Sequence, residues 1–446
     1  MQYRIEVDNI GEVKIPALLP YGAQTQRALN LYPVDNQKTL GDYASLINAV
    51  LRIKLASARV NREIGEMDPV LSLNVENTCQ SILENYQREL FPVHAFHGGG
   101  GISVNMNVNE VVANIVNQSY YAQPYGSYSP AHPNDAINMN HSTSDCLQTA
   151  SHLAAIEALD RLDITIERLI YALEYLIANH SDSSKLARTC MQDAVTIEFK
   201  QFWSGYLASL RTYQMHLKAC RNNLQAVNLS GNIIGRSGDC STAYAERCIS
   251  ALSDVTGIEL RKNDNLFQSS QSFDAQTNCV SQVENLAGFI IKIAKDLRLM
   301  SSGPEGGLSE ISLPAVQAGS SAMPGKVNPT IPEFAIQSAM QAQGHCYSSK
   351  QAHIHGELDY NPWGMLLIIN LLDAIDHLDK GISVLTEKCI LGIEVNSETQ
   401  SRNESALVPL VVRVKSKIGY KATLDHVKEA KNSAELKETL QEILKR

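Results

Sequence analysis

The stretch 319–329 combines residue types that can carry out proton transfer at carbon. It contains Ser320, Ser321, Lys326 and Asn328 in a segment that is also rich in glycine and proline. Glycine and proline at this density favour a polar loop over a buried helix or strand. A serine can act as a base only if backbone N–H groups and a nearby cation stabilise its alkoxide. Ser320 or Ser321 with Lys326 could meet that need, and the alternative is a flexible linker between helices.

A second candidate is the run of four glycines at 98–101, which precedes apolar residues at helical spacing from Val104 to Ile115. A glycine loop that opens a helix leaves unpaired N–H groups and the positive end of the helix dipole facing the loop. This arrangement would bind an anion, although a plain turn explains four glycines equally well.

A third candidate is the hydroxyl cluster Ser142, Thr143 and Ser144, which stands before Asp145 and an expected helix at 147–158. Ser, Thr and Asp are ordinary helix N-cap residues. One cap needs only one hydroxyl, so the other hydroxyls would be available to a ligand.

The elements that must position these groups are expected to be mostly α-helices, because apolar residues recur at helical spacing along most of the chain. Residues 1 to about 40 contain scattered prolines and glycines and are expected to form an arm of turns and short strands rather than a helix. Apolar residues at 290–297 and 366–372 cover more than one helix face, which favours subunit association. The helices are expected at 42–64, 71–90, 104–115, 147–158, 162–177, 199–217, 274–300, 331–348 and 365–385, with a small helix–loop–helix end over 425–446.

Composition narrows the class of protein. The 446 residues suffice for two or three domains, and the formal charge of −9 gives no support to nucleic-acid binding. The nine cysteines show no C-x-x-C pairs, which is typical of free thiols in a reducing compartment such as the cytoplasm. The charged N-terminus lacks the apolar segment of a signal peptide, and the apolar run Met365–Ile369 is too short to cross a membrane. We therefore expect a soluble cytoplasmic protein.

Several loops taken together resemble the signatures of the aspartase/fumarase superfamily, in its aspartase and class II fumarase branch. The strongest is the pattern G-S-S-x-M-P-x-K-x-N-P at 319–329. The others occur in the order that this family shows, namely Y-G-x-x-T-x-R at 21–27, G-x-S-x-N-M-N-x-N-E at 101–110, H-P-N-D at 132–135, S-T-x-D at 142–145 and R-T-x-x-Q-D-A at 188–194. The resemblance covers nearly the whole chain.

The resemblance implies a mainly α-helical subunit with three domains. It places an N-terminal helical domain with a coiled arm at 1–135, a central helical bundle at 136–392 and a small C-terminal domain at 393–446. Four such subunits would form a homotetramer around a twenty-helix core, with each active site built from loops of three subunits. The implied reaction is reversible β-elimination from a small dicarboxylate or amino-dicarboxylate of the succinyl type, without a cofactor.

The resemblance also implies roles for individual residues. Ser320 would be the general base, and Lys326 and Asn328 would hold one carboxylate of the substrate. Removing a proton beside a carboxylate requires stabilisation of the dianionic enediolate. Ser142, Thr143 and Ser321 would donate hydrogen bonds to it, Thr189 would line the leaving-group side, and Glu333 would be a supporting carboxylate.

Three positions depart from the family pattern. Cys190 stands where fumarases carry His and aspartases carry His or Gln. Ile102 replaces the usual Thr, so either Ser103 compensates as a carboxylate donor or the carboxylate pocket is altered. Ser144 replaces the usual Asn. These departures affect the identity of the substrate more than the type of reaction.

Three hypotheses remain open on the sequence. The first is an aspartate ammonia-lyase, and the second is a fumarase-like hydratase or a lyase for another substituted succinate. The third is a catalytically silent homologue, against which the retained Ser320, Lys326 and Asn328 argue. A metal site at His353 and His355 is a weak alternative because such clusters occur by chance in polar loops.

Overall fold

The computed structural model describes residues 2–236 and 238–446, and most of them lie in α-helices. The predicted mainly helical class is confirmed. The chain divides into two compact units: unit 1 comprises residues 1–162, 216–285 and 341–376, and unit 2 comprises 163–215, 286–340 and 377–446. The three-domain division near residues 135 and 392 stays a prediction.

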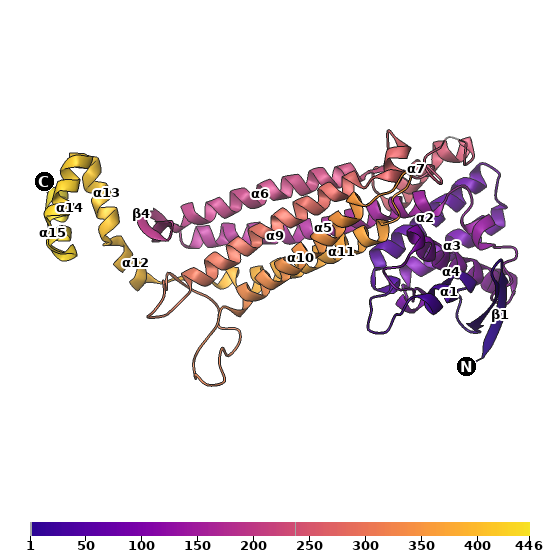
Figure 1. The fold of residues 1–446 in the computed structure, drawn as a ribbon, viewed down its shortest axis with the longest axis horizontal. Helices are drawn as coiled ribbons and strands as arrows, with labels where there is room; N and C mark the ends of the chain where they lie inside the picture. The colour runs from indigo at the N-terminus through magenta and orange to yellow at the C-terminus, as the bar shows by residue number, and fades with distance from the viewer. Residues whose placement is uncertain (1, 237) are drawn as a thin grey trace. The chain divides into compact units, whose positions relative to one another are not determined.

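Five helices of the described chain have 25 residues or more and are labelled in Figure 1. They are α5 (Thr143–Asn179), α6 (Phe199–Leu224), α9 (Asp274–Met300), α10 (Thr330–Ile354) and α11 (Gly364–Lys388). The helices expected at 274–300 and 365–385 are therefore confirmed. The two helices expected at 147–158 and 162–177 form the single helix α5, because the intervening residues include neither glycine nor proline.

Polar contacts join the long helices within each unit. In unit 1, Arg221 of α6 binds Asp160 of α5, with its Nε 2.5 Å from Oδ1. In unit 2, the Thr165 hydroxyl of α5 donates to Asp379 of α11 at 2.5 Å. Apolar side chains such as Leu286, Ile290 and Leu371 are fully buried along the same helices, so burial of apolar area supplies most of the driving force.

The N-terminal part of unit 1 begins with the antiparallel hairpin β1 (Tyr3–Asp8) and β2 (Gly11–Pro16). It continues with α1 (Ala23–Leu31), α2 (Ala44–Glu63), α3 (Pro69–Glu84) and α4 (Ile102–Tyr121). Short 3₁₀ or π turns lie at Leu40–Asp42, Arg88–Leu90, Gly99–Gly101 and Pro133–Ile137. The remaining elements of unit 1 are α7 (Thr242–Thr256), α8 (Leu266–Gln271) and the two-residue parallel strands β5 (Ala226–Val227) and β6 (Arg261–Lys262).

Helix α1 corrects the expectation that the first 40 residues hold no helix. The carboxylate of Glu110, on α4, accepts hydrogen bonds from the backbone N–H groups of Gly22, Gln24 and Thr25 at 2.8–3.1 Å. These N–H groups lie at the start of α1 and have no partner within the helix. The cap comes from a residue 85 or more positions away, so the local sequence carried no sign of it.

Unit 2 contains a β-hairpin that the sequence did not predict, formed by β3 (Ser184–Thr189) and β4 (Gln192–Glu198). It also contains β7 (Ile311–Ser312), which pairs with β8 (Glu394–Val395), and a 3₁₀ turn at Ile390–Gly392. The chain ends in α12 (Ser397–Glu404), α13 (Leu407–Ile418), α14 (Tyr420–Glu429) and α15 (Ser433–Lys445). The expected helix–loop–helix end is confirmed, and a small core of Leu410, Val414, Leu436 and Leu440 holds α13 against α15.

No helix among residues 2–236 and 238–446 combines the length and the apolar character needed to span a membrane.

Candidate active site

The signature loop, defined as residues 319–329, joins β7 to α10 and is closed at its base. The backbone N–H of Gly319 donates to the carbonyl of Lys326 at 2.8 Å. The Nδ2 amide of Asn328 donates to the carbonyl of Gly319, also at 2.8 Å. This bond uses one of the two N–H groups of the Asn328 amide, so the second is available to a ligand.

The Ser320 hydroxyl faces two backbone N–H donors of the signature loop. Its Oγ accepts hydrogen bonds from the N–H groups of Ala322 at 3.1 Å and of Met323 at 3.0 Å. Two such donors aimed at one hydroxyl oxygen stabilise negative charge on that oxygen. The geometry therefore favours Ser320 over Ser321 as the serine that can carry an alkoxide.

Lys326 supplies the cation of the signature loop. Its side chain is exposed, and it forms no ion pair within the part of the chain that the structure describes. Lys326 and Asn328 line a cavity of about 340 Å³, together with residues of β7 and of the preceding turn. A carboxylate could bind in this cavity without competing against a protein carboxylate for the lysine.

Thr189 and Cys190 lie at the tip of the β3–β4 hairpin, and both are exposed. The two residues of the turn, Cys190 and Met191, have φ values of 51° and 64°. Turns with two positive φ angles normally carry Asn or Gly, because other side chains are strained there. The strained turn presents Cys190 outward, so this thiol fills no space in the core of unit 2.

A buried carboxylate anchors strand β3 of this hairpin. Glu310 is only 2% exposed, and it binds Arg188 at 2.8 Å and Lys185 at 3.6 Å. Burial lowers the pKa of Lys185, and the charge of Glu310 opposes that effect. The Asn403 amide of α12 also donates to Glu310, at 3.4 Å. Sequence analysis missed Glu310 because no local pattern distinguishes it from a surface glutamate.

Glu333 lies in the first turn of α10, directly after the signature loop. Its carboxylate binds Arg298 of α9 at 3.1 Å, and both side chains are partly exposed. In this chain the carboxylate predicted as a supporting group is thus paired with a guanidinium.

In unit 1, the hydroxyl cluster Ser142–Ser144 stands at the start of α5. The N–H of Ser142 donates to Asp145 at 2.8 Å, and the N–H of Ser144 donates to the Ser142 hydroxyl at 3.2 Å. Ser142 thus caps the N-terminus of α5 through its hydroxyl, and the Asp145 carboxylate in turn accepts from the Ser142 N–H. Thr143 takes no part in the cap and is only half-buried, so its hydroxyl is available for another role.

The glycine run packs against this cluster. Gly99, Gly100 and Gly101 all have positive φ angles, and α4 begins directly after them. A Cβ on Gly101 would lie 2.1 Å from Leu147 Cδ1 of α5, so the glycine run lies against the start of α5 and a larger residue there would displace the Leu147 side chain. Ile102 is 42% exposed and Ser103 is half-buried at the first turn of α4, which leaves Ser103 as the polar side chain there.

A buried lysine that the sequence analysis did not single out lies behind the hydroxyl cluster. Lys54 of α2 is 1% exposed. Its ammonium donates to Asn105 Oδ1 at 2.7 Å and to Asn138 Oδ1 at 2.8 Å, and it lies 2.9 Å from His141 Nε2. The position of Lys54 on the apolar face of the helix expected at 42–64, one turn from Val50 and Leu51, was the available signal.

Burial shifts the pKa values of the groups in this cluster. It lowers the pKa of Lys54 and, together with the charge of Lys54, holds the pKa of His141 well below its ordinary value. Burial also raises the pKa of Asp145 to about 7, although the N–H donors of Ser142 and Asn232 oppose that shift. His141 is therefore neutral, with Nε2 accepting from Lys54 and Nδ1 donating to the Met139 carbonyl at 2.8 Å.

The structure thus gathers the predicted site residues into two groups, each within one unit. Unit 1 brings together Ser103, Ser142, Thr143 and Ser144 at the adjoining starts of α4 and α5. Unit 2 contains the signature-loop residues, the hairpin residues Thr189 and Cys190, and Glu333.

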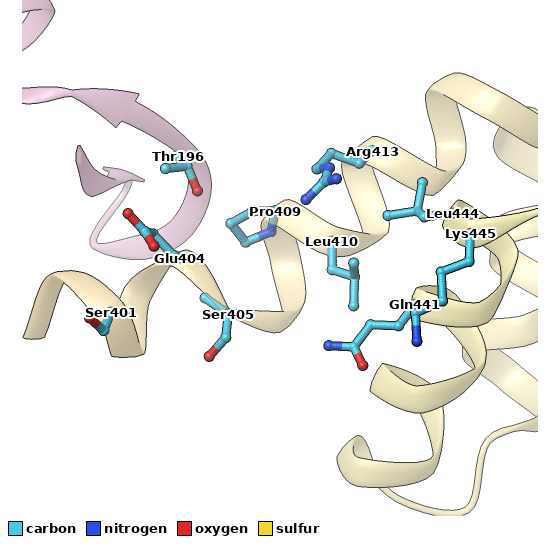
Figure 2. Close-up of a pocket in the computed structure, with 11 residues that line it drawn as sticks. Thr196, Ser401, Glu404, Ser405, Pro409, Leu410, Arg413, Gln441, Leu444 and Lys445 are labelled. Carbon is cyan, nitrogen blue, oxygen red and sulfur yellow. The ribbon is translucent and has the colours of Figure 1, made fainter. Parts of the chain in front are cut away.

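A larger cavity of about 780 Å³ lies among the C-terminal elements of unit 2 and is lined by residues of β4, α12, α13 and α15 (Figure 2). It contains none of the predicted site residues. Among the described residues, no group of three or more His, Cys, Asp or Glu side chains is placed to hold a metal ion.

Comparison with known proteins gives a consistent set of relatives. Residues 11–344 match a family described as lyase. The chain is 33% identical to an aspartate ammonia-lyase of Bacillus subtilis over 429 residues, which cover 96% of this chain and 90% of that protein. It is 32% identical to a class II fumarate hydratase of Thermosynechococcus vestitus over 419 residues, 94% of this chain and 89% of that protein.

Solved structures show the same similarity. A fumarate lyase:delta crystallin from Brucella melitensis bound to cobalt superimposes with a TM-score of 0.92 at 33% identity, covering 99% of both chains. A class II fumarase from Schistosoma mansoni gives a TM-score of 0.92 at 26% identity, covering 96% of this chain and 92% of that one.

Proposed function

The chain belongs to the aspartase/fumarase superfamily of lyases, and on that premise we propose that it catalyses reversible β-elimination from a substituted succinate to give fumarate. The proposed first substrate is aspartate, with release of ammonia. The observation that carries the proposal is the pair of backbone N–H donors on Ser320 Oγ, within the loop that also carries the Lys326 ammonium. This arrangement lowers the cost of an alkoxide base.

The proposed reaction uses the residues as follows. The Ser320 alkoxide takes the proton from the carbon beside one carboxylate, and the electron pair of that C–H bond delocalises into the carboxylate to form an enediolate. Ser142, Thr143 and Ser321 donate hydrogen bonds to the enediolate, while Lys326 and Asn328 hold the second carboxylate. The enediolate then collapses, a carbon–carbon double bond forms, and the bond to the leaving group breaks.

We place Ser103 at the edge of the carboxylate pocket and Thr189 and Cys190 on the leaving-group side. The strained turn at Cys190 and Met191 supports this placement, because strain of this kind clusters at functional sites. The Cys190 thiol is only a weak hydrogen-bonding group and the Ile102 side chain has none, so both differ from the polar groups usual at these positions. That observation favours a second candidate, a lyase for another substituted succinate or a hydratase.

We propose that the complete site forms in a homotetramer from loops of several subunits. A pair of exposed apolar residues on the unit 1 part of α10 supports association: Tyr347 and Ile354 are both 65% exposed and lie seven residues apart. This spacing places them on one helix face, as in helices that pack against a partner helix. Five long helices from each of four subunits would supply a twenty-helix core.

The test is direct. Purified protein is mixed separately with L-aspartate, with L-malate and with a panel of N- or C-substituted succinates, and the conjugated product is followed by ultraviolet absorbance. Turnover of aspartate supports the first candidate, and turnover confined to malate or to another succinate supports the second. Absence of turnover with every compound in the panel, in protein shown to be tetrameric, contradicts both and leaves the silent homologue.

A further inference from the structure

The Lys54 cluster has a directional property that follows from the chemistry of an ammonium group. An ammonium has three N–H donors and no acceptor, so each partner must present a lone pair to it. Lys54 has three oxygen or nitrogen partners, Asn105 Oδ1 at 2.7 Å, Asn138 Oδ1 at 2.8 Å and His141 Nε2 at 2.9 Å, and it also interacts with the Cys146 thiol. The lysine thereby fixes which side of each partner faces it.

Fixing Asn105 has a consequence at the hydroxyl cluster. With Oδ1 turned toward Lys54, the Nδ2 amide must face the other way, where it donates to Thr143 Oγ1 at 2.9 Å and to Asn138 Oδ1 at 3.0 Å. Asn105 is 1% exposed, so no solvent competes for its amide. Thr143 Oγ1 is therefore an acceptor on its buried side.

The Thr143 hydroxyl hydrogen must then point elsewhere. The Thr143 hydroxyl cannot donate to Asn105, because the Asn105 amide faces it with an N–H donor and not with an acceptor. Thr143 is half-buried at the N-terminus of α5, where the helix dipole also favours an anion. We propose that Lys54 is a positioning residue that acts through Asn105 to orient the Thr143 hydroxyl as a donor to the substrate carboxylate, an inference that rests on the proposed function.

The chain of hydrogen bonds from Lys54 through Asn105 to Thr143, called the relay below, also transmits polarisation. A charged donor at one end of a buried hydrogen-bond chain strengthens each following bond, because the surroundings screen it weakly. The ring of Tyr244 stacks on His141 with centroids 6.5 Å apart, which covers the cluster on that side. Burial lowers the pKa of Lys54, and the Cys146 thiol and the Asp145 carboxyl nearby oppose that effect.

The binding experiment uses the full-length protein and succinate, a saturated dicarboxylate that cannot undergo elimination, with affinity measured by calorimetry. Lys54→Met removes the charge and keeps the length of the side chain. Asn105→Asp keeps the shape and can still accept from Lys54, but it has no N–H to donate, so Thr143 must donate to it. Both variants are expected to weaken succinate binding about 10- to 100-fold, the loss expected for one hydrogen bond to a charged group.

Asn109→Asp is the matched control. Asn109 lies one turn further along α4, is fully buried and donates to the same Asn138 Oδ1 at 3.2 Å, but among the described residues no hydrogen bond joins it directly to Thr143. We expect Asn109→Asp to bind succinate within about threefold of the wild type. If Asn105→Asp and Asn109→Asp lost succinate affinity equally, the relay would be overturned. The loss would then be a general effect of placing a carboxylate in the buried cluster.

A double-mutant cycle separates orientation from folding. In a Thr143→Val background the hydroxyl is absent, so Asn105→Asp should cause no further loss of succinate affinity. If the losses of succinate affinity in Asn105→Asp and Thr143→Val were additive in the double variant, the inference would be overturned. This cycle does not use Lys54→Met, so it is informative even if that variant fails to fold. Wild-type protein that neither binds succinate nor turns over any diacid would instead overturn the proposed function, and with it the relay.

Discussion

Ser320 Oγ lies 3.0 Å from the backbone nitrogen of Met323, which donates a hydrogen bond to it. The N–H of Ala322 donates to the same oxygen at 3.1 Å. Backbone donors at the second and third positions after a serine form a local turn motif that also occurs in ordinary loops; here the motif lies in the loop that carries Lys326. Two N–H donors on one oxygen would lower the cost of an alkoxide at Ser320, which is what the proposed function requires.

Ser320→Ala tests that capacity. Loss of the base should lower kcat for elimination by about 10²- to 10⁴-fold, the usual contribution of general acid–base catalysis, without changing the oligomeric state. Steady-state kinetics with the best substrate of the panel and light scattering give the two measurements. Ser416→Ala, on the exposed face of α13, serves as the control, and wild-type kcat in Ser320→Ala would contradict the base assignment.

Cys190→His tests the leaving-group side. An imidazole at the tip of the β3–β4 hairpin would restore the residue type that fumarases carry, and we expect it to raise hydratase or ammonia-lyase activity measurably. The assay is ultraviolet detection with malate and with aspartate. No gain with either substrate would show that Cys190 does not face the leaving group.

Met191→Gly tests the strain in the same turn. Met191 has a φ of 64°, a conformation that glycine adopts without steric cost. The substitution should therefore raise the free energy of unfolding by about 0.5–1 kcal/mol, measured by urea denaturation. A loss of stability would mean that the exposed methionine side chain makes contacts, such as those between subunits, that outweigh the strain.

Glu310→Gln tests the anchor of the hairpin. The neutral amide would leave Lys185 and Arg188 without their buried anion. Because removing one partner of a buried ion pair lowers the free energy of unfolding by about 3–5 kcal/mol, we expect a loss of that size. Chemical denaturation measures the loss. Glu174→Gln is the control, since its pair with Arg211 is 45% and 59% exposed and such surface pairs contribute about 1 kcal/mol or less. Similar losses in the two variants would contradict the anchoring role.

Glu110→Gln tests a pH dependence. Burial raises the pKa of Glu110 from its ordinary 4.5 to about 7, although the donors of Thr25, Gln24 and Gly22 favour the ionised form. Between pH 4.5 and pH 7 the folded protein therefore binds more protons than the unfolded chain, so the free energy of unfolding falls as pH rises through this window and is level above it.

The decrease in the free energy of unfolding with rising pH is expected to differ between the wild type and Glu110→Gln. The wild type should lose about 3 kcal/mol more than Glu110→Gln between pH 4.5 and pH 8, as measured by urea denaturation at each pH. Asp145, whose pKa is also raised to about 7, contributes equally to both proteins. The same pH slope in both would show that Glu110 does not titrate in this range.

The sequence alone determined the family, the positions of the long helices and the polar loops. Helix positions follow from apolar periodicity, which is a local property, as in the confirmed helix at 274–300. The site loops carry unusual residue types at fixed spacing, so the pattern at 319–329 and the hydroxyl cluster at 142–144 are recognisable from the order of residues along the chain. The assembly, the domain boundaries and the cytoplasmic location stay predictions.

Only the tertiary structure decided how these residues are held. The cap of α1 comes from Glu110, the hairpin that presents Cys190 is anchored by Glu310, and the Thr143 hydroxyl is oriented through Asn105 by Lys54. Each of these contacts joins residues that are far apart in the chain. A hydrogen bond depends on distance and direction in space, and burial sets its strength. A local pattern of residue types records neither quantity, so these partners became visible only once the helices were packed.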